Sequence, residues 1–257
     1  MKQYSTPYGR VDLETDTRHM VVRLSGGYDS ALMTTLLAQS AEPGTIIHPV
    51  TVIRGQIEDA PELDRIDITP VANNVVQFVR DIAEPRGVEV RDTQFATAMK
   101  WNNTNSYADT QKLLISQVVE TFGDEDERKL RYVQYNGVTL NPPVQIAPDQ
   151  MHNGREIHRD QATYVDDGDV LSTPGVATIM RNCHLRSNRI CEPFGNADKR
   201  ITIWLGEHIG MLDELLAVSR SCEGDRESTN NWTEECMTEC WWCRERYWAL
   251  GHYKDTE

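Results

Sequence analysis

The segment Ser25-Gly26-Gly27-Tyr28-Asp29-Ser30 has the residue types and the spacing of an anion-binding loop. An apolar stretch that favours a strand precedes it at residues 19–24, and a run rich in Ala, Leu and Met that favours a helix follows it at residues 31–39. Glycines let backbone N–H groups approach an anion closely, and the start of a helix adds free N–H groups and partial positive charge. The segment therefore predicts a phosphate-binding turn, with an ordinary strand-to-helix turn as the alternative.

Asp29 is unusual in a loop that is otherwise suited to anions. A carboxylate is favourable there if a Mg²⁺ ion bridges it to phosphate oxygens. The segment lacks both the Gly-Lys-Ser pattern of a Walker A loop and the GxGxxG pattern of dinucleotide-binding folds. Asp29 is therefore a candidate catalytic residue that acts through a magnesium ion.

Six cysteines occur in the chain, and four of them gather near its end. These four are Cys222, Cys236, Cys240 and Cys243, separated by thirteen, three and two residues. Four clustered thiolates suit a tetrahedral Zn²⁺ ion, with an iron–sulfur cluster or four unrelated thiols as alternatives. Cys183 and Cys191 lie apart and are expected to be ordinary buried or surface thiols, with a redox pair as the less favoured alternative.

Strand and helix patterns alternate along most of the chain. Residues 45–53 and 88–90 predict strands, as do residues 130–135. Helices are predicted from Thr69 to Pro85, with the stripe Val71, Val75, Phe78, Val79 and Ile82, and over residues 107–122, with Leu113, Leu114, Val118, Val119 and Phe122 inward. Two more helices are expected over 198–205 and 211–218, the first capped by Asp198. The order predicts an α/β fold with a parallel sheet flanked by helices. Residues 1–18 are expected to be an irregular lead-in, 140–175 a long surface excursion and 223–235 a polar loop.

Charge and hydropathy exclude several partners. The chain has 257 residues, of which 26 are Lys or Arg and 40 are Asp or Glu, giving a net charge of -14. Nucleic-acid affinity is built largely from Lys and Arg contacts to phosphate, so nucleic acid is not expected as the main partner, although solubility alone also explains the acidity. No apolar run approaches the roughly 18 residues of a membrane span. The first residues lack the apolar stretch of a secretory signal. We therefore expect a cytoplasmic protein without a membrane partner.

The loop at residues 25–30 resembles the SGGxDS loop of the PP-loop ATP pyrophosphatases. The resemblance implies ATP at the carboxyl ends of the first strands and cleavage between its α and β phosphates. It implies that the loop holds pyrophosphate through Ser25, Gly26, Gly27, Tyr28, Asp29 and Ser30. It further implies that the backbone of Val52 and Ile53 meets the adenine.

The C-terminal quarter of the chain resembles the 7-cyano-7-deazaguanine (preQ0) synthases. The likeness rests on Lys199-Arg200-Ile201, on Ser221-Cys222, and on Cys236 followed by Cys240-Trp241-Trp242-Cys243. It implies a ligase that adenylates a carboxylate of a deazapurine acid, adds ammonia and dehydrates the amide to a nitrile, as in queuosine biosynthesis. The implied zinc is structural, and a homodimer is implied.

The resemblance divides the chain into an ATP-binding domain over residues 1–195 and a helical, zinc-binding segment over 196–257 packed on it. Lys199 is the candidate for neutralising phosphate charge, with a solvated lysine at a helix start as the alternative. Two other functions stay open: a PP-loop enzyme that thiolates or amidates a different acceptor, and a non-catalytic nucleotide-binding zinc module.

Overall fold

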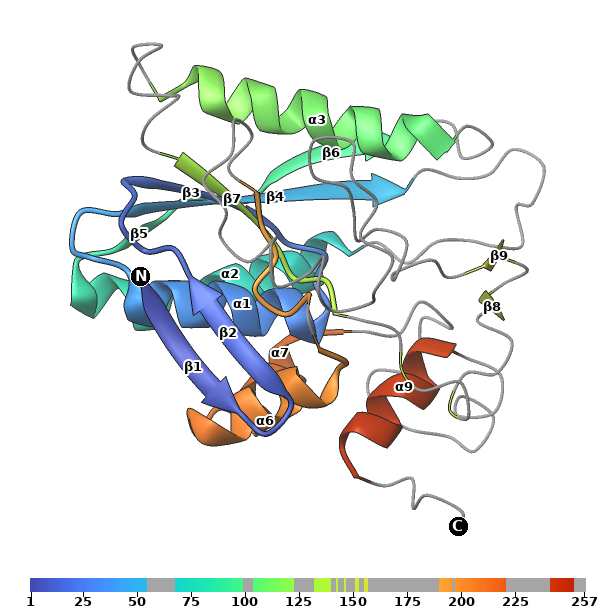
Figure 1. Cartoon of the computed structure of the whole chain (residues 1–257). Helices are drawn as coiled ribbons and strands as arrows, with labels where there is room; N and C mark the ends of the chain where they lie inside the picture. Colours follow the sequence, from blue (N-terminus) through green and yellow to red (C-terminus); the bar gives the residue numbers. More distant parts are fainter. Residues whose placement is uncertain are drawn as a thin grey trace, which may run out of the picture.

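A computed structural model describes most of the α/β part of the chain (Figure 1). The described residues are 1–54, 68–98, 104–122, 132–139, 142, 146, 151–152, 155–156, 190–195, 197–220 and 241–251.

The centre of the molecule is a parallel β-sheet. Its strands are β3 (His19–Arg23), β4 (Ile46–Arg54), β5 (Glu89–Val90), β6 (Gln94–Ala98), β7 (Tyr132–Asn136) and β10 (Ile190–Cys191). The order across the sheet is β10-β7-β3-β4-β5, with β6 also paired to β4, and every pairing is parallel. The chain therefore proceeds from β3 toward one edge of the sheet and later returns to the other side of β3.

Helices cover both faces of this sheet. On one face lie α1 (Tyr28–Ser40), α2 (Thr69–Ala83) and the short η1 (Glu84–Arg86), with α6 (Arg200–His208) and α7 (Leu212–Val218) packed beyond them. The opposite face carries α3 (Thr104–Glu120), drawn at the top of Figure 1. The last helix, α9 (Trp241–Ala249), follows near the end of the chain. A small hairpin, β8 (Met151–His152) and β9 (Arg155–Glu156), is also described.

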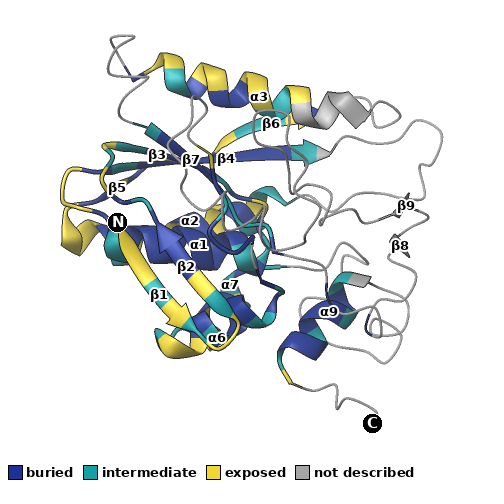
Figure 2. Ribbon diagram, viewed as in Figure 1, coloured by how far each residue is buried: buried dark blue, intermediate teal, exposed yellow. Residues whose placement is uncertain are grey.

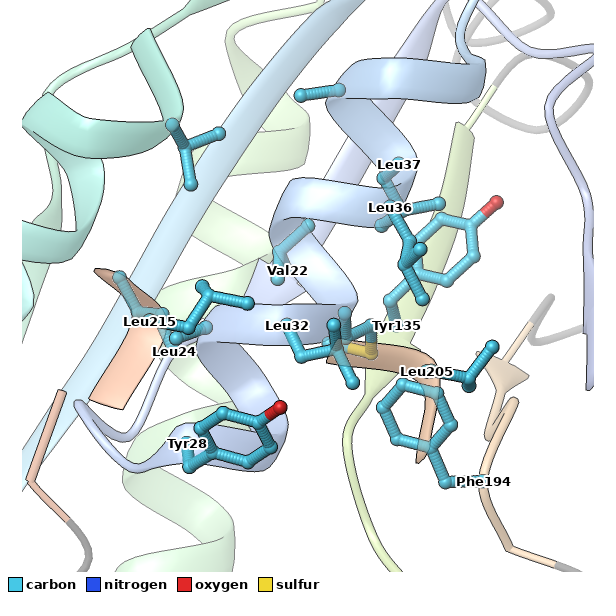
Figure 3. Packing of buried hydrophobic residues seen from close by; sticks show 14 of the residues in the cluster. Val22, Leu24, Tyr28, Leu32, Leu36, Leu37, Tyr135, Phe194, Leu205 and Leu215 are labelled. Atoms are coloured by element: carbon cyan, nitrogen blue, oxygen red, sulfur yellow. The ribbon is translucent and has the colours of Figure 1, made fainter. Parts of the chain in front are cut away.

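Helix α1 is the centre of the main hydrophobic core, because most of its side chains are buried rather than one stripe of them (Figure 2). Around Leu32 and Leu36 gather Leu24 and Tyr135 of the sheet side and Leu205 of α6 (Figure 3). A second, smaller core lies between the other face of the sheet and α3. Residues from both ends of the chain, from Val11 to Ala249, belong to the main core.

The observed fold confirms the expected α/β class with a parallel sheet between helices. The α2 stripe is confirmed at Val75 and Val79, which are fully buried. In α3 the expectation for Leu113 is wrong, since its side chain is 60% exposed and the neighbouring Ile115 is buried in its place. Both are aliphatic, so their order in the sequence does not distinguish the inward one.

The expectation of an irregular lead-in over residues 1–18 is also wrong. This stretch forms an antiparallel hairpin of β1 (Lys2–Thr6) and β2 (Gly9–Leu13). Val11 and Leu13 are fully buried in the main core, and the Tyr135 hydroxyl donates a hydrogen bond to the carbonyl oxygen of Glu14. The hairpin is therefore stabilised by docking on the core, which is how an otherwise marginal two-stranded unit becomes stable.

Several sequence predictions concern residues that the structure does not describe. The polar loop at 223–235 lies wholly outside the described residues, and so does most of the excursion over 140–175. Among the described residues, no helix combines the length and apolar character that crossing a membrane requires.

Candidate functional site

The candidate site lies where the chain reverses its direction of progress across the sheet. Strand β3 leads through α1 to β4 on one side, whereas β7 pairs with β3 on the other side. In open parallel sheets, ligands bind beyond the carboxyl ends of the strands at such a reversal. The segment from Ser25 to Ser30 follows β3 directly and begins α1, so it occupies this position.

The glycine turn is held by hydrogen bonds of its own residues. The Ser30 hydroxyl donates to the Gly27 carbonyl oxygen at 2.9 Å and accepts from the Ser25 amide at 3.2 Å. The Gly27 amide lies 3.3 Å from Ser25 Oγ. Gly26 has a φ of +78°, and a Cβ at this position would lie 3.4 Å from a methyl group of Val71 on α2. The turn therefore requires glycine at position 26 and has its shape before any ligand binds.

Tyr28 anchors the turn from below. Its side chain is fully buried and its hydroxyl donates to the Thr202 carbonyl oxygen of α6 at 3.1 Å. Burial, reinforced by the Asp29 charge, raises the pKa of Tyr28 far above its usual range, so the hydroxyl stays a donor. Only the backbone of Tyr28 is left to contact a nucleotide.

The structure brings Asp29 and Lys199 together, although 170 residues separate them in the sequence. Lys199 Nζ lies 2.7 Å from Asp29 Oδ2, and the Thr202 hydroxyl donates to Asp29 Oδ1 at 2.9 Å. Lys199 is buried, with a side chain only 5% exposed. The alternative of a solvated lysine is therefore wrong, and the ammonium group lies at the start of α1 beside the glycine turn.

Asp198 prepares this position. Its carboxylate accepts a hydrogen bond from the backbone N–H of Arg200 at 3.0 Å and an ion pair from the Arg200 guanidinium at 2.8 Å. The expected cap at Asp198 thus satisfies a free N–H group at the start of α6. This contact fixes the first turn of the helix that carries both Lys199 and Thr202 to Asp29.

A second carboxylate reaches Lys199 from the end of the chain. Glu245 Oε2 of α9 lies 3.5 Å from Lys199 Nζ, and the Glu245 side chain is completely buried. One buried ammonium group therefore lies between two carboxylates. Sequence reasoning missed Glu245 because it stands between two arginines, a pattern typical of a solvated helix face.

Strand β7 closes the other side of the turn through Gly137. A Cβ on Gly137 would lie 3.2 Å from the Asp29 carbonyl group and from Ser30 Cα. This close backbone approach requires a small residue immediately after the strand. Sequence analysis missed this position, and its only signal is a glycine directly after a predicted strand.

The expected adenine contacts lie on the adjacent strand. The register aligns Arg23 at the end of β3 with Val50, so β4 continues for four residues beyond β3. Over these residues the described partner of β4 is β6 alone, at Val52↔Ala96 and Ile53↔Thr97. The backbone of Val52 and Ile53 therefore extends past β3 toward the glycine turn, as the resemblance implies.

Of the four cysteines proposed as zinc ligands, only Cys243 lies in the described part of the chain. It is a buried free thiol on α9, two residues before Glu245. Cys222, Cys236 and Cys240 lie outside the described residues, within which no cluster of three or more His, Cys, Asp or Glu side chains could hold a metal. Cys191 is buried and disulfide-bonded, which corrects the expectation of an ordinary thiol there, and Cys183 lies outside the described residues.

Comparison with known proteins found no protein-family model that matches the chain and no curated protein that matches it.

Proposed function

We propose that the protein is an ATP-dependent C–N ligase that adenylates a carboxylate of a small deazapurine acid and uses ammonia to convert it to a nitrile. The observation that carries the proposal is the pairing of Lys199 with Asp29 at a preformed glycine turn, at the point where the sheet reverses its strand order. The arrangement supplies fixed anion donors, a buried cation and a carboxylate at one place. These are the groups that an enzyme cleaving a nucleoside triphosphate needs.

In this proposal the glycine turn holds the β and γ phosphates of ATP. The backbone N–H groups at the start of α1 and the exposed Ser25 hydroxyl are the donors. The backbone of Val52 and Ile53 meets the adenine at the free side of β4, which leaves the α phosphate above the end of β3. The α phosphate is then within reach of a carboxylate that enters from the β7 side.

Lys199 stabilises charge as the bond between the α and β phosphates breaks. An ammonium group held in a buried position can stabilise developing charge strongly, because it does not need to reorganise during the reaction. In the structure it is paired with Asp29, so the ion pair also fixes its direction. Asp29 is the positioning partner of Lys199 until ATP arrives.

The chemistry proceeds in two activations. The substrate carboxylate oxygen attacks the α phosphorus and pyrophosphate leaves, giving an acyl adenylate. Ammonia attacks the acyl carbon, and the amide and AMP are released with loss of a proton. A second ATP adenylates the amide oxygen with release of pyrophosphate, and elimination of AMP with loss of the amide protons leaves the nitrile.

Magnesium and zinc fit this site in different ways. The Asp29 carboxylate is a hard oxygen ligand whose two oxygens each accept one hydrogen bond, which leaves lone pairs for Mg²⁺ bridging to phosphate. When bound, Mg²⁺ would neutralise phosphate charge. The buried Cys243 thiol is a soft ligand suited to Zn²⁺, which would have a structural role together with Cys222, Cys236 and Cys240.

The test is incubation of the full chain with ATP, Mg²⁺, ammonium and 7-carboxy-7-deazaguanine, followed by mass spectrometry. We expect the nitrile, with two AMP and two pyrophosphate per molecule of product. Formation of AMP and pyrophosphate only with a different acceptor would indicate another PP-loop activity. Absence of any acid-dependent ATP cleavage, with zinc and nucleotide bound, would contradict the proposal in favour of a non-catalytic module.

A further inference from the structure

Beside the glycine turn, three polar side chains form a row across neighbouring strands on the α3 face of the sheet. Val21 of β3 and Tyr132 of β7 pack in the core under α3, so Arg23 and Asn136, whose positions differ from theirs by an even number of residues, lie on that same face. Register places Arg23 opposite Asn136. Asn136 Nδ2 donates to Glu192 Oε1 at 2.9 Å, which extends the row to the residue after β10.

The row has a defined order of donors and acceptors. Arg23 is a donor, and its Nε and Nη2 are held 2.8 and 2.6 Å from the oxygen of the buried Gln134, with the amide turned so that its oxygen faces the guanidinium. Because the Asn136 amide nitrogen donates to Glu192, its oxygen is the group left to accept. Glu192 is an acceptor. Across the sheet the row therefore reads donor, acceptor, acceptor.

The position of the row matches that of the second substrate. Arg23 lies two residues before Ser25, and Asn136 directly precedes Gly137, which touches the backbone of Asp29 and Ser30. All three side chains of the row are half-buried, so they are both ordered by the protein and reachable from solvent. A ligand on the row would lie next to phosphates held by the glycine turn.

We propose that Arg23, Asn136 and Glu192 bind the ring edge of the acceptor acid and select a 2-amino-4-oxo pyrimidine edge, as in guanine. Such an edge presents a carbonyl oxygen, a ring N–H and an amino group in sequence, which is complementary to donor, acceptor and acceptor. A 6-amino purine edge places an amino group opposite Arg23 and a bare ring nitrogen opposite the Asn136 oxygen. The row therefore admits deazaguanine acids and rejects deazaadenine acids. This inference rests on the proposed function.

The test measures binding by titration calorimetry with the full chain and α,β-methylene-ATP, whose bridge between the α and β phosphates is not cleaved. The acids compared are 7-carboxy-7-deazaguanine and its deazaadenine counterpart. Glu192→Gln keeps the size and the Asn136 contact but presents an N–H group to the ligand amino group. A lost hydrogen bond to a charged group predicts about 10- to 100-fold weaker binding of the deazaguanine acid, with unchanged nucleotide affinity.

Two further variants keep the interpretation clear. Arg23→Lys retains the charge but loses the planar pair of donors, so we expect weaker binding of the deazaguanine acid. Glu89→Gln, on β5 at the opposite end of the sheet strands, is the matched control and should bind like the unaltered chain.

The outcomes separate this inference from the proposed function. Unchanged acid affinity in both Glu192→Gln and Arg23→Lys would overturn the role of the row and leave the proposed function intact. Equal binding of the two acids by the unaltered chain would also overturn it. No binding of α,β-methylene-ATP by the unaltered chain would remove the proposed function and this inference together.

Discussion

Lys199 is a buried cation shared by Asp29 and Glu245, and a cation in this position has two consequences. Removing one partner of a buried ion pair is costly because the remaining charge stays in a poorly solvated place. The same low solvation makes the ammonium group effective toward phosphate. Stability and activity should therefore both depend on this one side chain, and through different partners.

Lys199→Met is expected to lower the free energy of unfolding by about 3 kcal/mol, because two buried carboxylates lose their ion-pair partner. Adding Glu245→Gln to this variant removes one of the two charges and should recover part of the loss. Urea unfolding of the two single variants and the double variant measures the coupling. Strictly additive losses would contradict the shared ion pair.

Asp29→Asn is expected to reduce the proposed ATP cleavage by about 10²- to 10³-fold, because it removes the charge that positions Lys199 and that would bind Mg²⁺. Asparagine retains an oxygen for the Thr202 hydroxyl, so the thermal midpoint should change little. The measurement is steady-state AMP release, with Asp92→Asn at a highly exposed carboxylate as the control. Equal rates in the two variants would show that Asp29 has no role.

His48 should make the molecule sensitive to acid. It is buried at the amino end of the strands, 3.0 Å from His19, and both rings contact Phe122. Burial, with the charges of His19 and Arg91, lowers the pKa of His48 to about 3. A group whose pKa is lower in the folded state stabilises the fold fully above its unfolded pKa, and this stability falls as pH decreases below about 6.5.

Between pH 7.5 and pH 5.5, the His48 contribution should therefore fall by about 1 kcal/mol. We expect His48→Gln to lose less stability over this interval than the unaltered chain does. Urea unfolding at the two pH values compares them. An identical loss in both proteins would show that His48 is not the group responsible.

At the scale of elements, the contact of α1 with α6 fixes the distance between the glycine turn and Lys199. Gly206 of α6 faces the Tyr28 hydroxyl so closely that a Cβ there would overlap it. Alanine normally favours a helix over glycine by up to about 1 kcal/mol. At this position the overlap should outweigh that preference.

Gly206→Ala is expected to lower the free energy of unfolding by about 1–3 kcal/mol. Removing the Tyr28 hydroxyl with Tyr28→Phe in the same chain should restore part of this stability. Thermal unfolding of the single and double variants is the measurement. If the double variant is no more stable than Gly206→Ala, the contact is not the cause.

The sequence predicts these elements well where their patterns are local. The periodic stripe of α2 and the β-branched run of β4 each identify an element, and Gly26-Gly27 identifies the turn between β3 and α1. Docking depends on the whole fold and leaves no local pattern. That is why the hairpin of residues 2–13, the outward direction of Leu113 and the buried carboxylate of Glu245 were not predicted.

The same distinction holds for the candidate site. The sequence nominated Asp29 and Lys199 separately, from a motif and from a resemblance, and the contact between them appears only in three dimensions. Arg23, Asn136 and Glu192 belong to no motif, because their proximity arises from the register of three parallel strands.

For the whole molecule, the decisive property is that distant parts of the chain share one core and one site. Leu13, Leu36, Leu205 and Trp248 belong to the same buried cluster. Lys199 and Glu245 reach the glycine turn from the last quarter of the chain. Loss of order near the end of the chain should therefore reach the site through α9.

Zinc removal tests this connection. We expect the purified chain to contain about one zinc per molecule and Cys243→Ser to contain much less. Chelation should lower the thermal midpoint on the order of 5–10 °C, because a structural metal contributes several kcal/mol to folding. Metal analysis and thermal unfolding are the measurements. A metal-free chain with an unchanged midpoint would contradict the zinc proposal.

The central claim is that the turn from Ser25 to Ser30 binds the phosphates of ATP. A crystal structure of the full chain with α,β-methylene-ATP and Mg²⁺ tests it most directly. The account predicts the β and γ phosphates against the backbone amides of the turn, with Lys199 in contact with them and the adenine at Val52 and Ile53. A nucleotide bound elsewhere, or no nucleotide at saturating concentration, would contradict it.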